Sequence, residues 1–387
     1  MLYTNIEAVL RQTEAIVTDV VLPQATIVDQ LGQWAEPGLR ALQAAGLGGL
    51  VAPTSCGGLG FGLLAVAQVC ERLGQACAST GLCFGMHCVG TAVIAARATT
   101  EQQQHYLVPI VEGKHLTTLA LSETGTGSHF YLPETKLSQI DDKSYLVNGT
   151  KTFITNGGYA DSYVISTAAA DVNAPPGTFS CLVIEGNTQG LIWGAPWNGL
   201  GMRGNSSRSL ILDNVVVPHY ALLGQEGDEI WYVFNVVAPY FLMAMSGTYL
   251  GIATAALEEG RKHLAQRHYT YTGTRLAQNN LLQHRLGTLW AQVERTRRLI
   301  YYAATEGDQA GVNTLPALLS AKAEVAECAV NVVNEVMTLM GGRAYQGDSV
   351  LHRNLRDARA AHVMAPTTEM LYTWLGRYLL DLPLLGE

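Results

Sequence analysis

A loop rich in glycine and hydroxyl side chains lies at Leu119–Ser128, which reads LALSETGTGS. Glycine lets the backbone approach a ligand closely and present its N–H groups as donors, and hydroxyls add further hydrogen bonds. A loop of this kind is suited to hold a cofactor, although turns of similar composition are common in proteins. Its chemistry therefore depends on the residues that the fold brings next to it.

Histidine and cysteine occur close together at one place, where His87 stands between Cys83 and Cys88. A structural zinc site uses four ligands, often as two spaced pairs, and no second Cys/His pair at ligand spacing accompanies this one. The 7 cysteines are odd in number and mostly embedded in apolar helical sequence, which is typical of reduced, buried thiols. We therefore predict no metal site.

The elements that must position these residues fall into three segments. Apolar residues recur every three or four positions in 1–119, alternate in 120–226, and return to the helical period in 227–387. We predict an α+β fold with an N-terminal helical domain, a middle β-barrel or sandwich domain, and a C-terminal four-helix bundle, with domain boundaries at these positions. Long helices with wide apolar stripes also predict subunit contacts, in a homodimer or homotetramer.

Two local signals refine this organisation. Asn148–Gly149 stands between the β-rich runs Tyr145–Val147 and Thr152–Ile154, which is typical of a hairpin turn. Gly341–Gly342 follows a long apolar helical face, so we expect the helix to end there.

Composition excludes several classes of function. The 32 acidic and 24 basic residues give a net charge of -8, and no long basic run is available to neutralise nucleic-acid phosphates. We read no uncharged apolar stretch as long as a membrane span and no basic, then apolar, start typical of a signal peptide. We therefore expect a cytoplasmic protein without nucleic-acid or membrane partners.

Several motifs resemble those of the acyl-CoA dehydrogenases. Leu119–Ser128 resembles L-A-L-T-E-P-G-x-G-S, and the longer segment Asn148–Gly158 resembles N-G-x-K-x-[WF]-I-T-N-G. Gly199–Arg208 resembles G-x-x-G-x-R-G-S, and we interpret it as structural. Met340–Tyr345 and Leu355–Ala358 resemble the L-G-G-x-G-[YF] and R-D-A blocks. The resemblance covers nearly the whole chain.

The resemblance implies a flavin cofactor, FAD rather than FMN. It implies that Phe153 packs against the isoalloxazine ring, that Thr155 hydrogen-bonds near its reactive nitrogen, and that Arg267 faces the FAD diphosphate of a neighbouring subunit. The predicted cofactor-binding residues are Leu121, Ser122, Gly127, Ser128, Phe153, Thr155, Arg267, Thr338, Gly341, Gly342, Thr367 and Glu369.

The resemblance fails at the catalytic base. Dehydrogenation of a thioester requires a carboxylate that removes the α-proton while the flavin takes a hydride. Most family members place this glutamate shortly after R-D-A, where this chain has Ala365, and some place it on an earlier helix, where this chain has Phe241. The arginine that usually follows the second position is Leu242. Neither position offers a carboxylate.

A relocated base is one alternative. Glu369 is the nearest carboxylate, one helical turn beyond Ala365, and Tyr240 and His362 are further candidates. In the other alternative the chain resembles the flavin monooxygenases of the same fold, which also lack the glutamate. There Thr155, His87, His129 or His362 would hydrogen-bond the reacting groups or donate a proton.

Three functions follow for this chain. The first is a flavin oxidoreductase acting on an acyl thioester, CoA-linked or carrier-protein-linked, or on a related biosynthetic intermediate by non-standard chemistry such as oxygenation, with an electron-transfer or flavin-reductase partner. The second is a dehydrogenase with a relocated base, and the third is a catalytically silent flavin- or acyl-binding subunit. The predicted substrate-pocket residues are His87, His129, Tyr240, Phe241, Leu242, Met245 and Ala365.

Overall fold

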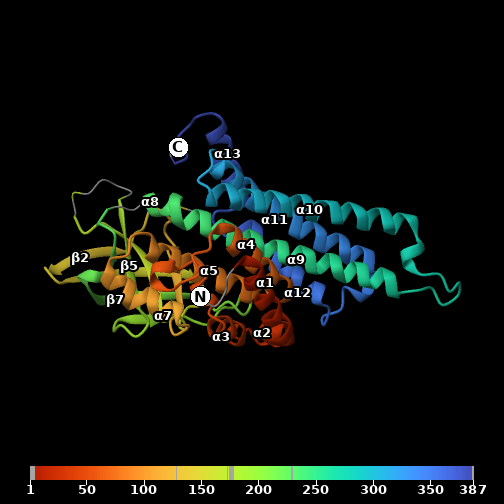
Figure 1. Ribbon diagram of the computed structural model, residues 1–387, viewed down its shortest axis with the longest axis horizontal. Helices are drawn as coiled ribbons and strands as arrows, with labels where there is room; N and C mark the ends of the chain where they lie inside the picture. The colour runs from red at the N-terminus through yellow and green to blue at the C-terminus, as the bar shows by residue number, and fades with distance from the viewer. Residues whose placement is uncertain (1–4, 128, 172, 174–177, 228–229, 386–387) are drawn as a thin grey trace.

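The computed structural model describes residues 5–127, 129–171, 173, 178–227 and 230–385. Helices come first, strands follow, and helices return to the end of the chain, with the strands gathered at one end of an elongated molecule (Figure 1). The predicted order of segments and the α+β class are therefore confirmed.

Helix α5 is the centre of the N-terminal part, and most of its residues are buried. It packs against α4 on one side and against the first strand on the other. Its apolar side chains fill the space between the sheet and the C-terminal helices, and form a closely packed wall between them. The helices of this part are α1 (Ile6–Ile16), α2 (Leu22–Leu31), α3 (Glu36–Ala44), α4 (Leu63–Ala76), α5 (Ala78–Ala96), α6 (Thr100–Gln102) and α7 (Val108–Val111).

The middle part contains two four-stranded sheets. One has the order β1-β4-β5-β8 and the other β2-β3-β7-β6, and all recorded pairs are antiparallel except β1 with β4. Neither sheet closes into a barrel, so the barrel alternative is wrong. The strands are β1 (Thr117–Ala120), β2 (Lys136–Asp141), β3 (Ser144–Ile154), β4 (Ser162–Ala168), β5 (Phe179–Glu185), β6 (Leu191–Trp193), β7 (Arg208–Pro218) and β8 (Leu222–Leu223).

The predicted hairpin turn at Asn148–Gly149 is wrong, because both residues lie inside the continuous strand β3. The pairing register with β7 shifts between Val147 and Gly149, and the Asn148 side chain accepts a hydrogen bond from the backbone N–H of Asn214 at 2.8 Å. The dipeptide therefore forms an irregularity within a strand instead of a turn between two strands.

Three long helices run side by side through the C-terminal part (Figure 1). Helix α9 also packs closely against α4, because Gly247 and Gly251 leave room that a side chain would fill: a Cβ atom at either position would lie within 2.3 Å of an α4 backbone oxygen. Helix α11 ends at Met340 with Gly341 at φ 65°, as predicted. The helices are α8 (Ile230–Tyr232), α9 (Ala238–Gln266), α10 (Asn280–Asp308), α11 (Thr314–Met340), α12 (Val350–Val363) and α13 (Thr368–Leu379).

Two helical stretches are long and apolar enough to cross a membrane by length and composition, Ala78–Ala96 and Val233–Gln266. The expectation that no such stretch exists was therefore wrong. In both, 94% of the most apolar window is buried inside the protein. This burial is typical of core helices, which pass the same test of composition.

Candidate functional site

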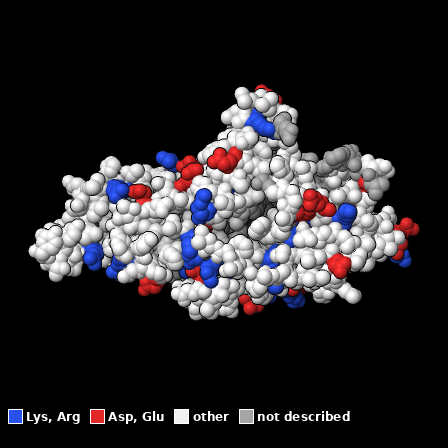
Figure 2. Space-filling view, turned by 180° about the vertical axis from the view of Figure 1, so that it is seen from behind, with Lys and Arg blue, Asp and Glu red and all other residues white. Residues whose placement is uncertain are grey.

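One cavity of about 750 Å³ lies where all three parts of the chain meet. Helix α5 contributes Leu82 and Met86, the segment that follows β1 contributes Leu121 and Ser122, and the C-terminal helices contribute Phe241. The volume falls within the range of small-molecule pockets, which are mostly apolar with a few fixed polar groups. On the face turned away from the viewer of Figure 1, the surface is hollowed near the middle, with basic side chains at its edges (Figure 2).

Strand β3 turns an aromatic ring into this cavity. Its register against β7 shifts between Lys151 and Ile154, and Phe153 adopts a φ of 55°. A positive φ is costly for an aromatic residue and is found where the surroundings enforce it, often at functional sites. As a result the Phe153 side chain is 68% exposed and lines the cavity, with its ring 6.3 Å from that of Trp197.

Thr155 and Asn156 follow on the same strand end. Thr155 lines the cavity, and its carbonyl accepts a hydrogen bond from the Thr118 hydroxyl at 3.0 Å. The buried Asn156 side chain accepts from the Trp34 indole at 2.9 Å and donates to the Cys83 carbonyl at 3.0 Å. These bonds fix the cavity end of β3 to the N-terminal helices.

A buried ion pair supports the glycine-rich loop from behind. The Lys151 ammonium lies 2.5 Å from a carboxylate oxygen of Glu123, which also accepts from the Thr135 hydroxyl at 2.7 Å. Burial would raise the pKa of Glu123, but the attraction of Lys151 and these hydrogen bonds hold it below its ordinary value. Burial lowers the pKa of Lys151 to about 8, against the opposing effect of Glu123. Glu123 is therefore an ionised side chain with a structural role, paired with Lys151.

The loop itself joins β3 at the cavity wall. The backbone N–H of Thr152 donates to the Ser122 carbonyl at 2.8 Å. Leu121, Ser122 and Gly127, which were predicted to bind the cofactor, all line the cavity, whereas Ser128 lies outside the described residues. The Thr152 hydroxyl is buried at the wall without a hydrogen-bond partner in the described part of the chain. It therefore leaves a donor and an acceptor for a bound group.

The end of α12 forms the opposite wall. Ala365 lines the cavity together with Met364 and Pro366, and Phe241 reaches it from α9. Both positions at which related enzymes keep their base are therefore brought to one cavity, and both are apolar here. Among the described lining residues the only carboxylate belongs to Glu123, which Lys151 already holds.

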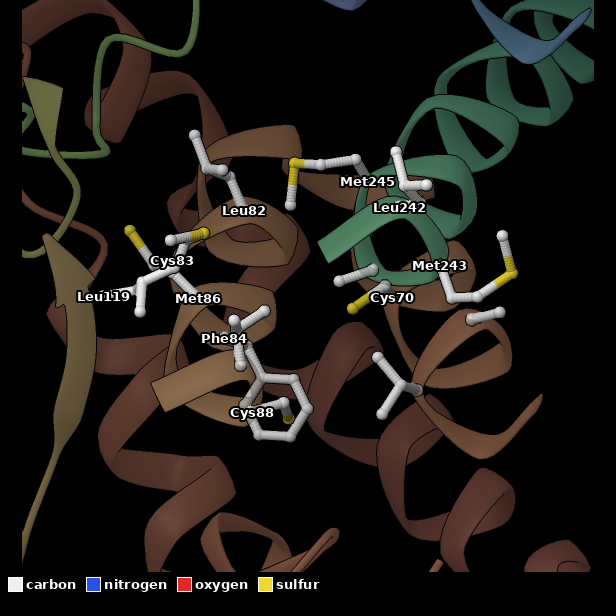
Figure 3. Packing of buried hydrophobic residues seen from close by; sticks show 14 of the residues in the cluster. Cys70, Leu82, Cys83, Phe84, Met86, Cys88, Leu119, Leu242, Met243 and Met245 are labelled. Atoms are coloured by element: carbon white, nitrogen blue, oxygen red, sulfur yellow. The ribbon is translucent and has the colours of Figure 1, made fainter. Parts of the chain in front are cut away.

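Several residues predicted for the substrate pocket lie elsewhere. His87 is fully buried, with Nε2 2.9 Å from the Gly48 carbonyl and Nδ1 3.1 Å from the Thr117 backbone nitrogen, which donates to it. Burial lowers the pKa of His87 to about 4, so the imidazole is neutral at pH 7 and braces the backbone. Figure 3 shows Leu242 and Met245 on α9 packed among the buried side chains near α5. None of these three lines the cavity.

Tyr240 and His129 also lie outside the cavity lining. Tyr240 is half-buried, and burial raises its pKa to about 12. His129 is exposed, with its ring 5.7 Å from that of Tyr131. Neither side chain is placed to serve the cavity as an acid or base, because a proton donor must come within hydrogen-bond reach of the reacting group.

The predicted relocated bases Glu369 and His362 flank the α12–α13 connection, and neither lines the cavity. Glu369 is exposed in the first turn of α13 and does not line the cavity. His362 lies 3.3 Å from the Thr368 hydroxyl, and burial lowers its pKa. Thr367 is half-buried and caps α13 by accepting from the Met370 backbone N–H. These residues stabilise the helix start, and no described contact brings them to the cavity.

A second group of predicted cofactor residues gathers at the other end of the long helices. Arg267 borders a basic pocket of about 450 Å³ with Lys262, His263 and Arg343. Thr338 is exposed in the last turns of α11, and the exposed Gly341 and Gly342 follow it. Helix α9 rises about 1.5 Å per residue, so roughly 40 Å separate this pocket from Phe241.

Sequence reasoning missed other residues of the cavity. The segment Gly199–Arg208, interpreted as structural, contributes Leu200, Met202 and Asn205 to the lining. Other residues of the segment do brace the β-domain: Arg208 donates to the Gly194 carbonyl at 2.6 Å, and the Ser206 hydroxyl donates to the Gly157 carbonyl at 2.9 Å. Arg359 also lines the cavity and directly follows the R-D-A block, a position that could have drawn attention to it.

A helical part, a two-sheet part and a second helical part share this one cavity. Three family models match the chain: the acyl-CoA dehydrogenase N-terminal domain at residues 4–114, the middle domain at 118–215 and the C-terminal domain at 241–380. An acyl-CoA dehydrogenase of Bacillus subtilis (strain 168) is 30% identical over 361 residues, 93% of this chain and 94% of the relative. The chain belongs to the acyl-CoA dehydrogenase family.

Solved structures agree with this assignment. Butyryl-CoA dehydrogenase from Megasphaera elsdenii superposes with a TM-score of 0.91 at 25% identity, covering 98% of this chain and 99% of that one. The prolyl acyl carrier protein oxidase AnaB has a TM-score of 0.85 at 21% identity, covering 97% and 100%, and shares the fold.

The family uses FAD, and the residues present fit a flavin. The buried Thr152 hydroxyl without a partner, the strained and exposed Phe153 ring and the nearby Trp197 ring offer a hydrogen bond and flat apolar surfaces to a planar group. The site therefore suits a flavin ring, while the usual carboxylate is absent from the described part of its wall.

Proposed function

We propose that this protein is an FAD-dependent oxidoreductase that acts on an acyl thioester, or a related biosynthetic intermediate, by a reaction that needs no protein carboxylate. Oxygenation is the reaction that fits best. The observation that carries this proposal is the pair Ala365 and Phe241, which occupy both positions of the family's base and line the same cavity. An α-proton abstraction without a base would lose a rate factor of roughly 10² to 10⁴.

Thr152, Phe153 and Thr155 are the residues that would hold the flavin ring, with the loop around Ser122 beside them. When bound, FAD supplies two-electron redox chemistry, and in its reduced form it supplies oxygen transfer from O₂. The Thr155 hydroxyl would hydrogen-bond the reacting oxygen. The apolar side chains of Met86, Phe241 and others would exclude water, which competes with such a reaction.

The overall reaction balances with one external reductant. One atom of O₂ would enter the substrate, and the other would leave as water with two hydrogens that reduced FAD would supply when bound. Each turnover would consume two electrons, which a flavin reductase or an electron-transfer flavoprotein would have to supply. The relocated base Glu369 receives no support from the geometry, because its side chain is exposed outside the cavity.

We propose a thioester substrate because the family acts on thioesters and because Arg359 offers a cation in the cavity lining. Among the described residues no ion pair involves Arg359, whereas the neighbouring Arg356 is paired with Asp29. A phosphate of CoA or of a carrier-protein arm would suit this guanidinium. We further propose that the basic pocket around Arg267 faces the FAD diphosphate of a second subunit in a homo-oligomer.

Rapid mixing tests this function. The FAD-loaded protein is reduced anaerobically with dithionite and mixed with oxygenated buffer in a stopped-flow spectrophotometer. We expect a transient spectrum that differs from both reduced and oxidised flavin, and we expect it to be shorter-lived in Thr155→Val, which removes the hydroxyl and keeps the shape. A direct return to oxidised flavin at the rate of free flavin would contradict oxygenation. Anaerobic bleaching by an acyl-CoA would instead indicate a dehydrogenase.

A further inference from the structure

Lys322 on α11 is a fully buried lysine that points at the end of the cavity wall. Its ammonium lies 2.6 Å from the Ala361 carbonyl, 3.4 Å from that of Met364 and 3.1 Å from that of Pro366. An ammonium has three N–H donors and no acceptor, so three carbonyls satisfy it completely. These hydrogen bonds of Lys322 all go to backbone carbonyls, and no ion pair of this side chain occurs among the described residues.

The three carbonyls belong to the end of α12 and to the connection that follows it. The last carbonyls of a helix have no partner within the helix, and a cation at this end interacts favourably with the helix dipole. Lys322, on the neighbouring helix α11, supplies both a hydrogen-bond donor and a positive charge to this helix end. Met364 and Pro366 line the cavity on either side of Ala365, so this one side chain holds the backbone on both sides of the position where related enzymes carry their base.

We propose that Lys322 is a positioning residue that fixes the Met364–Pro366 wall against the bound flavin. This inference rests on the proposed FAD site. A well-placed wall needs support from residues behind it, because a shift of about 1 Å in a contact residue is enough to weaken a site. Lys322 touches neither cofactor nor substrate, and acts through the backbone it holds.

The burial of Lys322 adds a constraint on its charge. Burial lowers the pKa of Lys322 to about 7, whereas three accepting carbonyls favour the charged form, which alone can donate to all of them at once. A neutral side chain of similar length cannot replace it: methionine offers no donor, and glutamine offers two.

Binding of oxidised FAD tests the role of Lys322 without turnover. FAD affinity and the visible flavin spectrum are measured for the wild type, Lys322→Met and Lys322→Gln. We expect the dissociation constant to rise about tenfold or more in Lys322→Met, with a changed flavin band, and to rise less in Lys322→Gln. If Lys322→Met does not fold, Lys322→Gln alone carries the test.

Arg297→Met is the matched control, because Arg297 is a largely buried cation on α10 that pairs with Glu71 away from the cavity. We expect it to lower the melting temperature while FAD affinity and spectrum stay at the wild-type values. Wild-type affinity and spectrum in a folded Lys322 variant would overturn the inference. A wild type that binds no FAD would instead overturn the proposed function, and one that binds FAD but gives no transient with O₂ would leave the role of Lys322 standing.

Discussion

Asp357 on α12 accepts a hydrogen bond from the backbone N–H of Met202 at 2.6 Å, and this contact joins two walls of the cavity. Burial raises the pKa of Asp357 to about 6, above its ordinary 3.8. The folded protein therefore binds more protons than the unfolded chain between these values. The contribution of Asp357 to the unfolding free energy is therefore complete below about pH 4 and is lost as the pH rises through 6.

The variant Asp357→Asn keeps an oxygen acceptor for Met202 and removes the titrating charge. As the pH rises from 4 to 8, we expect the wild type to lose about 3 kcal/mol of unfolding free energy relative to this variant. Denaturant unfolding of both proteins at several pH values measures this difference. A difference that stays constant over this range would rule out Asp357 as the titrating group.

Returning a carboxylate to the cavity should restore the chemistry that it lacks. In Ala365→Glu we expect an acyl-CoA to bleach oxidised flavin anaerobically, at least about 100-fold faster than in the wild type, because a positioned base contributes this much or more. Ala365→Gln has the same size without the basic group and serves as control. Equal bleaching in both variants would show that the new side chain acts by shape alone.

Glu369→Gln should leave the reaction with oxygen and FAD binding within about twofold of the wild type, because Glu369 is exposed outside the cavity. Its loss from the first turn of α13 should cost no more than about 1 kcal/mol through the helix dipole. Stopped-flow spectra and thermal unfolding check the two parts. A loss of tenfold or more in the flavin reaction would return Glu369 to the list of catalytic residues.

The buried pair of Glu123 and Lys151 should be sensitive to removal of one partner. We expect Lys151→Met to lower the unfolding free energy by about 3–5 kcal/mol, since it leaves the Glu123 carboxylate buried without its cation. Lys151→Met combined with Glu123→Gln should recover much of this loss. Denaturant unfolding of the protein without FAD makes the comparison, and a double variant no more stable than Lys151→Met would argue against the pair.

If a second subunit's cofactor lies against the basic pocket, Arg267→Glu should weaken FAD binding although Arg267 lies roughly 40 Å from Phe241 along α9. Arg261→Glu is the control, because Arg261 lies on the same helix, pairs with Glu258 and does not border the pocket. Equilibrium dialysis with FAD compares the two. Equal affinities would separate the basic pocket from cofactor binding.

The sequence allowed the order of the three parts and the absent base to be predicted, because both depend on local pattern and on motifs. Periodicity follows from which face of each element is buried, and Ala365 could be located by counting from the R-D-A block. Phe153 and Ser122 were singled out in the same way, since each belongs to a motif of the resemblance, and both line the cavity.

Other features depend on contacts between distant segments. Asn148–Gly149 has the composition of a turn, but pairing with β7 keeps it within a strand. His87 lies on α5, and its orientation is decided by the carbonyl of Gly48 and the backbone of Thr117. Lys322 carries no motif at all, because its partners are backbone atoms about forty positions later.

Helix α9 is one uninterrupted element of 29 residues from the cavity to the basic pocket. Between these two ends, close backbone contact at Gly247 and Gly251 holds the helix against α4. If the proposed second subunit contacts the Arg267 end, the same helix that carries this contact also carries Phe241 in the cavity wall.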